Sequence, residues 1–206
     1  FSAEQTLALL DYGDDSGVTP REAGSTRFES RILVVKVIAM ALPSPAWYAV
    51  SGAPSSGKTT TVRLLAARGY RTTEEQARAI IAEEMAKGRT LEEVRGAGEW
   101  FQEVILERQL ALEALLPHDE TVFLDRGTPD GLAYERFLKL QPNPALAAAA
   151  QRSPYRRVFL LEPLGFAADH GRIEDSETQA NLHHAIRDTY VELGFDVVDV
   201  PVLAPE

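Results

Sequence analysis

Gly52-Ala53-Pro54-Ser55-Ser56-Gly57-Lys58-Thr59 is the stretch of this 206-residue chain that decides the fold. It fits the phosphate-loop pattern G-x-x-x-x-G-K-[ST] at every fixed position. Residues 47–51 before it predict a short buried strand, and residues 60–68 after it predict a helix. Because both flanks agree, we interpret the stretch as a nucleotide-binding loop, against the alternative of a glycine turn that binds nothing.

The chemistry of the loop explains its residues. Glycines let the backbone curl until successive N–H groups point at phosphate oxygens, and the start of the following helix adds a partial positive charge. Lys58 is expected to reach the β- and γ-phosphates, and the Thr59 hydroxyl is expected to ligate Mg²⁺. The residues expected to contact a nucleoside triphosphate are Gly52, Ser55, Ser56, Gly57, Lys58, Thr59 and Thr60.

Composition narrows the class of protein. Hydrophobic residues make up 45% of the chain and charged residues 25%, which is typical of a globular protein with a substantial core. The net charge of −10 argues against a surface that tracks extended nucleic acid. There are no cysteines, which excludes disulfides, thiolate metal sites and cysteine nucleophiles and agrees with a cytoplasmic location.

The residues that precede the loop and its strand are predicted to form a separate N-terminal extension. Residues 1–46 read as mostly helix and loop, followed by a nucleotide-binding domain at residues 47–206. Residues 32–42 are strongly apolar, but the run is too short to span a bilayer and carries Lys36 at its middle. We therefore expect no membrane span, and a helix that is buried or that faces a protein partner.

A second candidate site follows the phosphate-loop helix. Residues 69–72 fit a short strand, and Thr73 then predicts a helix N-cap. Glu75 and Arg78, three residues apart, share a face of that helix. The pair is either a surface ion pair of little energetic value, or it stands at the carboxyl end of a strand, where open α/β sheets bind ligands. In the second case Glu75 is a base or acceptor-binding group, and Arg78 binds an anion.

Residues 121–125 form the second strong motif. A run of apolar residues that ends in Asp125 is typical of a buried parallel strand with an acidic tip. Beside a phosphate loop, such an aspartate holds Mg²⁺ or its water. Arg126 follows at once, so we expect it at the edge of the active site, where it grips phosphate, unless it pairs with Asp130 in its own loop.

The remaining candidates rest on single features. Residues 164–177 are polar and contain glycine, and they predict a lid in which Arg172 stabilises charge on the transferred phosphate. Gln109, on the helix predicted over residues 99–116, could face a pocket, but as an isolated glutamine it is assigned to the surface by default. The adjacent His183 and His184 point apart on a helix, so we expect no metal site there.

Helical spacing predicts which side chains face the core. The predicted core positions are Ala77, Ile80, Ile81, Met85, Trp100, Val104, Leu112, Leu115, Leu182, Ile186 and Tyr190. Along the chain, strands and helices alternate, which predicts a doubly wound α/β domain with helices on both faces of the sheet.

Taken together, the motifs resemble a known family. They are Gly52–Thr59, Glu75-Gln76-Ala77-Arg78, Leu124-Asp125-Arg126-Gly127, and Gly171-Arg172-Ile173-Glu174 through Leu193-Gly194-Phe195. Over residues 47–203 the chain resembles the AAA_28 group of predicted ATPases, which is related to the ribosylnicotinamide-kinase domain of NadR and more distantly to nucleoside and nucleotide kinases.

The resemblance implies an α/β fold, a three-layer P-loop NTPase of nucleoside/nucleotide-kinase type. Its five-stranded parallel sheet would have the phosphate-loop strand at the centre. The resemblance also implies that Mg²⁺-NTP binds at the loop with Asp125 near the metal. Glu75, Arg78 and Arg126 would then line the acceptor side, and Arg172 would belong to the lid.

Two functions fit these residues. The first is a small-molecule kinase, in which ATP gives its γ-phosphoryl group to a hydroxyl of a nucleoside-like acceptor. Glu75 or Asp125 would orient or deprotonate that hydroxyl, and Lys58, Arg126, Arg172 and Mg²⁺ would neutralise charge. The second is an NTPase or nucleotide-gated switch that acts on a protein partner.

The acidic balance and one missing motif bear on the choice of substrate. A nucleic-acid kinase is a third, weaker hypothesis because the chain carries a net charge of −10. The sequence has no guanine-reading Asn-Lys-x-Asp motif, which favours ATP and leaves GTP as the alternative.

Overall fold

A computed structural model describes residues 45–164 and 176–202 of the chain. Most of the predicted N-terminal extension, and the predicted lid with Arg172, lie outside the described residues. The described elements, in chain order, are β1 (Trp47–Ser51), α3 (Lys58–Ala67), β2 (Arg71–Thr72), α4 (Gln76–Ala86), α5 (Leu91–Gly96), α6 (Gly98–Glu113), β3 (Val122–Asp125), α7 (Thr128–Phe137), α8 (Pro144–Arg152), β4 (Arg157–Leu161), α9 (Ser176–Glu192) and β5 (Val197–Val200).

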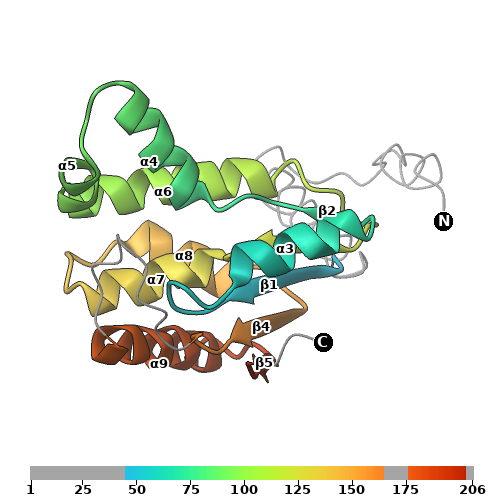
Figure 1. Ribbon diagram of the computed structural model, residues 1–206. Coiled ribbons are helices and arrows are strands. Elements are labelled where there is room, and N and C mark those ends of the chain that lie inside the picture. Colours follow the sequence, from blue (N-terminus) through green and yellow to red (C-terminus); the bar gives the residue numbers. More distant parts are fainter. Residues whose placement is uncertain (1–44, 165–175, 203–206) are drawn as a thin grey trace, which may run out of the picture. The chain divides into compact units, whose positions relative to one another are not determined.

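The five strands form one parallel sheet in the order β2-β3-β1-β4-β5 (Figure 1). The central strand is β1, and Val50 pairs with Asp125 at the ends of β1 and β3. Parallel strands end at the same edge of a sheet, so the loops after β1 and β3 start side by side, where such sheets bind ligands. The predicted fold class, with five parallel strands and the phosphate-loop strand at the centre, is confirmed.

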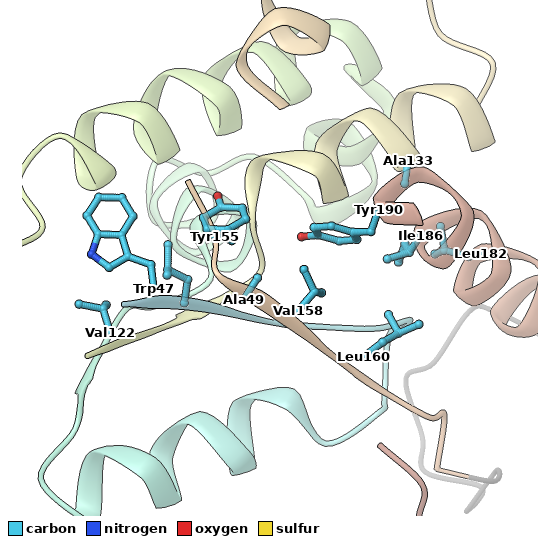
Figure 2. Packing of buried hydrophobic residues seen from close by; sticks show 11 residues of the cluster. Trp47, Ala49, Val122, Ala133, Tyr155, Val158, Leu160, Leu182, Ile186 and Tyr190 are labelled. Atoms are coloured by element: carbon cyan, nitrogen blue, oxygen red, sulfur yellow. The ribbon is translucent and has the colours of Figure 1, made fainter. Parts of the chain in front are cut away.

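Side chains alternate between the two faces of the sheet, and each face has its own core. The core on one face joins the strands to α7 and α9, and consists of Trp47, Ala49, Val122, Leu124, Ala133, Tyr155, Val158, Leu160, Leu182, Ile186 and Tyr190 (Figure 2). On the other face, Val50 and Leu161 pack against Val62 of α3. Helices on both faces give the predicted three layers.

The prediction of Thr73 as a helix N-cap is wrong. Helix α4 begins at Gln76 with Glu75 as its N-cap residue, two positions after Thr73. Thr73 instead extends the pairing of β2, because its N–H donates to the Phe123 carbonyl oxygen at 3.1 Å. Its hydroxyl accepts from the Asp125 N–H at 3.3 Å, so Thr73 supports the end of β3 rather than the start of a helix.

The prediction that three further residues lie in the core is also wrong. Met85 is 50% exposed, Trp100 38% and Leu115 84%. Trp100 is covered in part by the Arg89 guanidinium, which lies 4.9 Å from its ring centroid. In α9 the same spacing rule succeeds, since Leu182, Ile186 and Tyr190 are all buried. Among the described residues, no helix has both the length and the apolar character that crossing a bilayer requires.

Candidate active site

The phosphate-loop motif forms the connection between β1 and α3. Its backbone adopts left-handed angles at Ser55 (φ 64°) and Gly57 (φ 82°), and Gly52 has a φ of 136°. A Cβ on Gly52 would lie 2.5 Å from the Leu161 carbonyl oxygen, so this position requires glycine. The loop therefore curls tightly ahead of α3, the arrangement in which backbone N–H groups converge on a phosphate.

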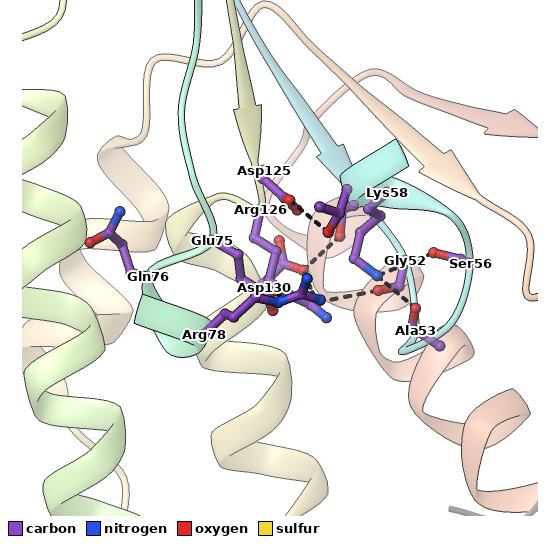
Figure 3. A network of polar contacts seen from close by, with 12 residues as sticks. Gly52, Ala53, Ser56, Lys58, Glu75, Gln76, Arg78, Asp125, Arg126 and Asp130 are labelled. Carbon is purple, nitrogen blue, oxygen red and sulfur yellow. Dashed lines mark hydrogen bonds and ion pairs between the residues drawn. The ribbon is translucent and has the colours of Figure 1, made fainter. Parts of the chain in front are cut away.

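Lys58, the first residue of α3, lies inside this curl. Its Nζ donates to the Ala53 carbonyl oxygen at 2.7 Å and to Ser56 Oγ at 3.1 Å (Figure 3). Burial, together with the charge of Arg126, lowers the pKa of Lys58 to about 7, although nearby carboxylates oppose the shift. An incoming phosphate would replace a carbonyl oxygen as the partner of this ammonium.

Asp125 and Thr59 face each other across the loops that follow β3 and β1. The Thr59 hydroxyl donates to Asp125 Oδ2 at 3.2 Å. The other carboxylate oxygen, Oδ1, is sealed from solvent and has no hydrogen-bond partner among the described residues. Burial, helped by the charge of Glu75, raises the pKa of Asp125. A buried carboxylate with an unused oxygen beside a hydroxyl is a fitting pair of ligands for a hard cation.

These two residues suit Mg²⁺ in particular. Within residues 45–164 and 176–202, no group of three or more His, Cys, Asp or Glu side chains could hold a metal. Mg²⁺ does not need such a cage, because it commonly binds through one or two protein oxygens together with substrate phosphates and water. Asp125 and Thr59 therefore fit Mg²⁺ that arrives with a nucleotide.

Arg126 joins three parts of the site. It has a left-handed backbone (φ 72°). Its guanidinium donates from Nε to Glu75 Oε1 at 2.7 Å, and from Nη1 to Asp130 Oδ1 at 3.0 Å and to the Gly52 carbonyl oxygen at 3.2 Å (Figure 3). Arg126 thus pairs with Asp130, as one prediction had it, and at the same time ties α4 and the phosphate loop to the end of β3.

Glu75 is partnered mainly by Arg126 and only loosely by Arg78. The distance from Arg78 Nε to Glu75 Oε2 is 3.6 Å, and the Arg78 side chain is 65% exposed. Burial raises the pKa of Glu75, but the charge and hydrogen bond of Arg126 outweigh it, so the net shift is downward. Glu75 is therefore an ionised carboxylate in a largely buried place.

Asp130 is a site residue that the sequence marked only as an alternative partner for Arg126. It is buried and, besides Arg126, accepts hydrogen bonds from Ser51 Oγ at 2.6 Å, from the Tyr190 hydroxyl at 2.6 Å and from the Gly127 N–H at 3.1 Å. Its place at the third position of α7, next to the helix N-terminus, is the signal that pointed to it. Through its hydrogen bond to Nη1, this carboxylate holds the Arg126 side chain in place.

A cleft of about 800 Å³ connects these residues to a second compartment. At one end it is lined by the phosphate loop and the start of α3. At the other it is lined by α4, α5, α6 and α7, mostly with apolar side chains, among them Ile81, Leu91, Phe101, Ile105, Leu106 and Tyr134. Glu75, Asp125 and Arg126 line the same cleft. It therefore has room for a second molecule beside a nucleotide.

A family model agrees with this geometry. The model of the AAA_28 family, described as an AAA domain, matches residues 47–204. The chain belongs to this family. The match spans all the described strands and helices and both halves of the cleft, so the predicted resemblance is confirmed.

Solved structures share the fold of this AAA_28 chain. A crystal structure of NadR protein in complex with NR is 22% identical, with a TM-score of 0.59, over 76% of this chain and 45% of that one. A thymidylate kinase from Ehrlichia chaffeensis is 13% identical, with a TM-score of 0.54, over 79% of this chain and 90% of that one. The chain thus spans less than half of the NadR chain. A search of curated proteins found no match.

The structure of the AAA_28 chain brings most of the predicted site residues together. Those that line the cleft are Ser55, Ser56, Gly57, Lys58, Thr59, Thr60, Glu75, Arg78, Asp125 and Arg126. Gly52 is not among the lining residues, but its carbonyl oxygen accepts from Arg126. Arg172 lies outside the described residues. Gln109, assigned to the surface by default, is only 5% exposed and lines the cleft, so that assignment is wrong.

Proposed function

We propose that this AAA_28 chain is a small-molecule kinase that transfers the γ-phosphoryl group of Mg-ATP to a hydroxyl group of a small acceptor. The observation that carries the proposal is the single cleft of about 800 Å³, which joins a phosphate loop to a partly apolar compartment. A hydrolase needs only a water beside the γ-phosphate, whereas a kinase needs room for a second substrate.

The loop end of the cleft would hold the donor nucleotide. Backbone N–H groups of the curled loop would bind the phosphates, and Lys58 would exchange the Ala53 carbonyl oxygen for phosphate oxygens. Thr59 and Asp125 would hold Mg²⁺, which when bound neutralises charge on the phosphates. The sealed Oδ1 of Asp125 supports this role, because it is a buried acceptor without a hydrogen-bond partner among the described residues.

Glu75 would act on the acceptor. Its ionised carboxylate accepts the proton of the acceptor hydroxyl while the hydroxyl oxygen forms a bond to the γ-phosphorus. At the same time the bond between the γ-phosphorus and the β,γ-bridging oxygen breaks, which releases ADP. Arg126 holds Glu75 in place and adds positive charge beside the transferred group. Arg78, which lines the cleft with an exposed side chain, would bind an anionic part of a substrate. The predicted lid arginine, Arg172, remains a prediction.

The cleft also bears on the alternative, a nucleotide-gated switch. Glu75 and Arg126 lie in an enclosed, charged setting next to the phosphate loop, which a protein that merely senses nucleotide does not need. The apolar residues 32–42 that would favour a partner lie outside the described residues. The kinase is therefore the better-supported function.

The test is to incubate the full chain with Mg-ATP and a panel of nucleosides and nucleotides, and to look for phosphorylated product by mass spectrometry. A kinase gives a product whose mass is that of one acceptor plus one phosphate. Hydrolysis of ATP with no phosphorylated acceptor from the whole panel would support the NTPase or switch instead.

A further inference from the structure

The acceptor end of the cleft contains a polar side chain that the proposed chemistry does not use. Helix α6 presents Phe101, Ile105 and Gln109 to the cleft on successive turns. Gln109 is 5% exposed, and apart from Gln102 the other residues of α6 that line the cleft are apolar. A glutamine in such a place requires hydrogen-bond partners for both ends of its amide.

One end of the amide is fixed by Glu113, one turn further along α6. Gln109 Nε2 donates to Glu113 Oε1 at 2.7 Å. The Tyr155 hydroxyl, on the face of the sheet that α7 and α9 cover (Figure 2), donates to the same oxygen, and it accepts from the Thr128 N–H at 2.9 Å. The Tyr155 hydroxyl thus accepts from Thr128 and gives its one proton to Glu113, so Glu113 Oε1 serves as an acceptor. Gln109 must therefore turn its NH₂ group toward Glu113.

The other end of the amide, Gln109 Oε1, faces the cleft. No described residue donates to this oxygen. Among the described residues, the side-chain atoms that are sealed from solvent without a partner are Asp125 Oδ1 and His183 Nδ1, and Gln109 Oε1 is not one of them. The oxygen therefore reaches open space, and the open space that Gln109 lines is the cleft.

We propose that Gln109 is a specificity-determining residue, which accepts a hydrogen bond from an amine or ring N–H of the acceptor. This inference rests on the proposed kinase function, since the acceptor is the molecule that would fill this end of the cleft. The substrate class is a nitrogen heterocycle that carries a donor at its edge and packs its apolar faces against residues such as Phe101 and Ile105. Glu113 is a positioning residue, because it holds the amide so that an oxygen, and not an NH₂ group, meets the ligand.

The proposal predicts discrimination by a single donor group. The probes are three matched pairs of nucleosides: adenosine and purine riboside, cytidine and 2-pyrimidinone riboside, and uridine and 3-methyluridine. The second member of each pair lacks the amine or N–H of the first. For the pair that is phosphorylated fastest, we expect kcat/KM to favour the donor-bearing member by about tenfold or more, because a buried acceptor left unpaired is costly.

Two variants of the full chain assign this preference to the amide. Gln109→Met keeps the side-chain length and removes the amide, so the ratio of the two kcat/KM values should fall close to one. Gln102→Met removes a different cleft-lining amide from α6, and the ratio should stay as in the wild type. If Gln109→Met does not fold, as judged by circular dichroism, Gln109→Asn serves instead, since its amide is too short to reach both Glu113 and the ligand.

The outcomes separate this inference from the proposed function. Phosphorylation of both members of a pair at equal rates, or a preference that survives in the Gln109 variant, would overturn the role of Gln109 and leave the kinase intact. A preference that Gln102→Met abolishes equally would also overturn it. No product from any nucleoside or nucleotide, while Mg-ATP still binds, would overturn the kinase and this inference with it.

Discussion

The two ends of the cleft are built in opposite ways. At the loop end, Lys58, Asp125 and Arg126 are charged groups packed close together, and a network of hydrogen bonds holds each of them. At the helix end, the walls are mainly apolar, with polar side chains such as Gln102 and Gln109 among them. Under the proposed kinase function, this difference is a division of labour, in which the loop end carries the chemistry that any phosphoryl transfer needs and the helix end decides which molecule receives the phosphate.

Replacing Glu75 is the sharpest way to separate the two ends. Glu75→Gln removes the proposed base but keeps the size of the side chain, so we expect turnover to fall by about 10²- to 10⁴-fold, while Mg-ATP affinity changes little. Steady-state kinetics on the best acceptor and calorimetry with an ATP analogue measure the two effects. Glu74→Gln, at the exposed neighbouring position, is the control. Full turnover in Glu75→Gln would mean that another group accepts the proton.

Asp130 tests whether the loop end is held together by its charge network. Asp130→Ala removes the buried carboxylate that accepts from Arg126, Ser51 and Tyr190, so we expect the free energy of unfolding to fall by about 3–5 kcal/mol. Urea unfolding followed by fluorescence measures the loss. Asp199→Ala breaks an exposed pair with Arg187 and should cost far less. Similar midpoints for the two variants would show that the network adds no stability.

The loop end of the cleft was easier to predict from the sequence than the helix end, because most of it is encoded by local patterns. Eight contiguous residues fix the backbone of the phosphate loop, and Asp125 follows its strand directly, so local patterns suffice. The link from Arg126 to Glu75 joins residues 51 positions apart, and it depends on β2 and β3 lying side by side. The sequence offered Asp130 as a partner of Arg126 and paired Glu75 only with Arg78, so the bond between Arg126 and Glu75 is seen only in the fold.

The helix end depends on which way each helix turns, and there spacing alone was misleading. Trp100 and Leu115 were predicted core residues of the long helix, yet both are exposed. Gln109, on the same helix, was assigned to the surface and is buried. The rotation of α6 is set by α4 and α7 packing against it, and by the link from Glu113 to Tyr155, which lies 42 residues away. Such long-range contacts leave no periodic mark in the sequence.

Lys58 tests the loop end by itself. Lys58→Ala removes the ammonium from the curl of the loop, so we expect triphosphate affinity to fall by about a hundredfold, as for the loss of a charge-assisted hydrogen bond in a buried site. Isothermal titration calorimetry with an ATP analogue and Mg²⁺ measures it. Lys87→Ala removes a lysine that pairs with Glu84 and does not line the cleft, and it should bind as the wild type does. Unchanged affinity in Lys58→Ala would rule out the loop as the nucleotide site.

The smallest expected effect is a pH dependence that belongs to the loop end alone. Burial holds the pKa of Lys58 at about 7, so in the free chain this lysine loses its proton as the pH rises through neutrality. A bound triphosphate favours the charged form and raises that pKa, so above neutral pH binding must take up a proton. Affinity should therefore fall as the pH rises, by about tenfold between pH 6 and pH 8.

Calorimetry in buffers of different ionisation enthalpy measures this proton uptake directly. Lys58→Arg keeps the positive charge but does not titrate in this range, so its affinity should be nearly flat with pH once the titration of the nucleotide itself is subtracted. No lysine is among the described residues that line the apolar helix end, so the affinity of a neutral nucleoside acceptor should not follow the same curve. If acceptor and nucleotide affinities fell together with rising pH, the two ends of the cleft would be coupled through Lys58, and the division of labour between them would not hold.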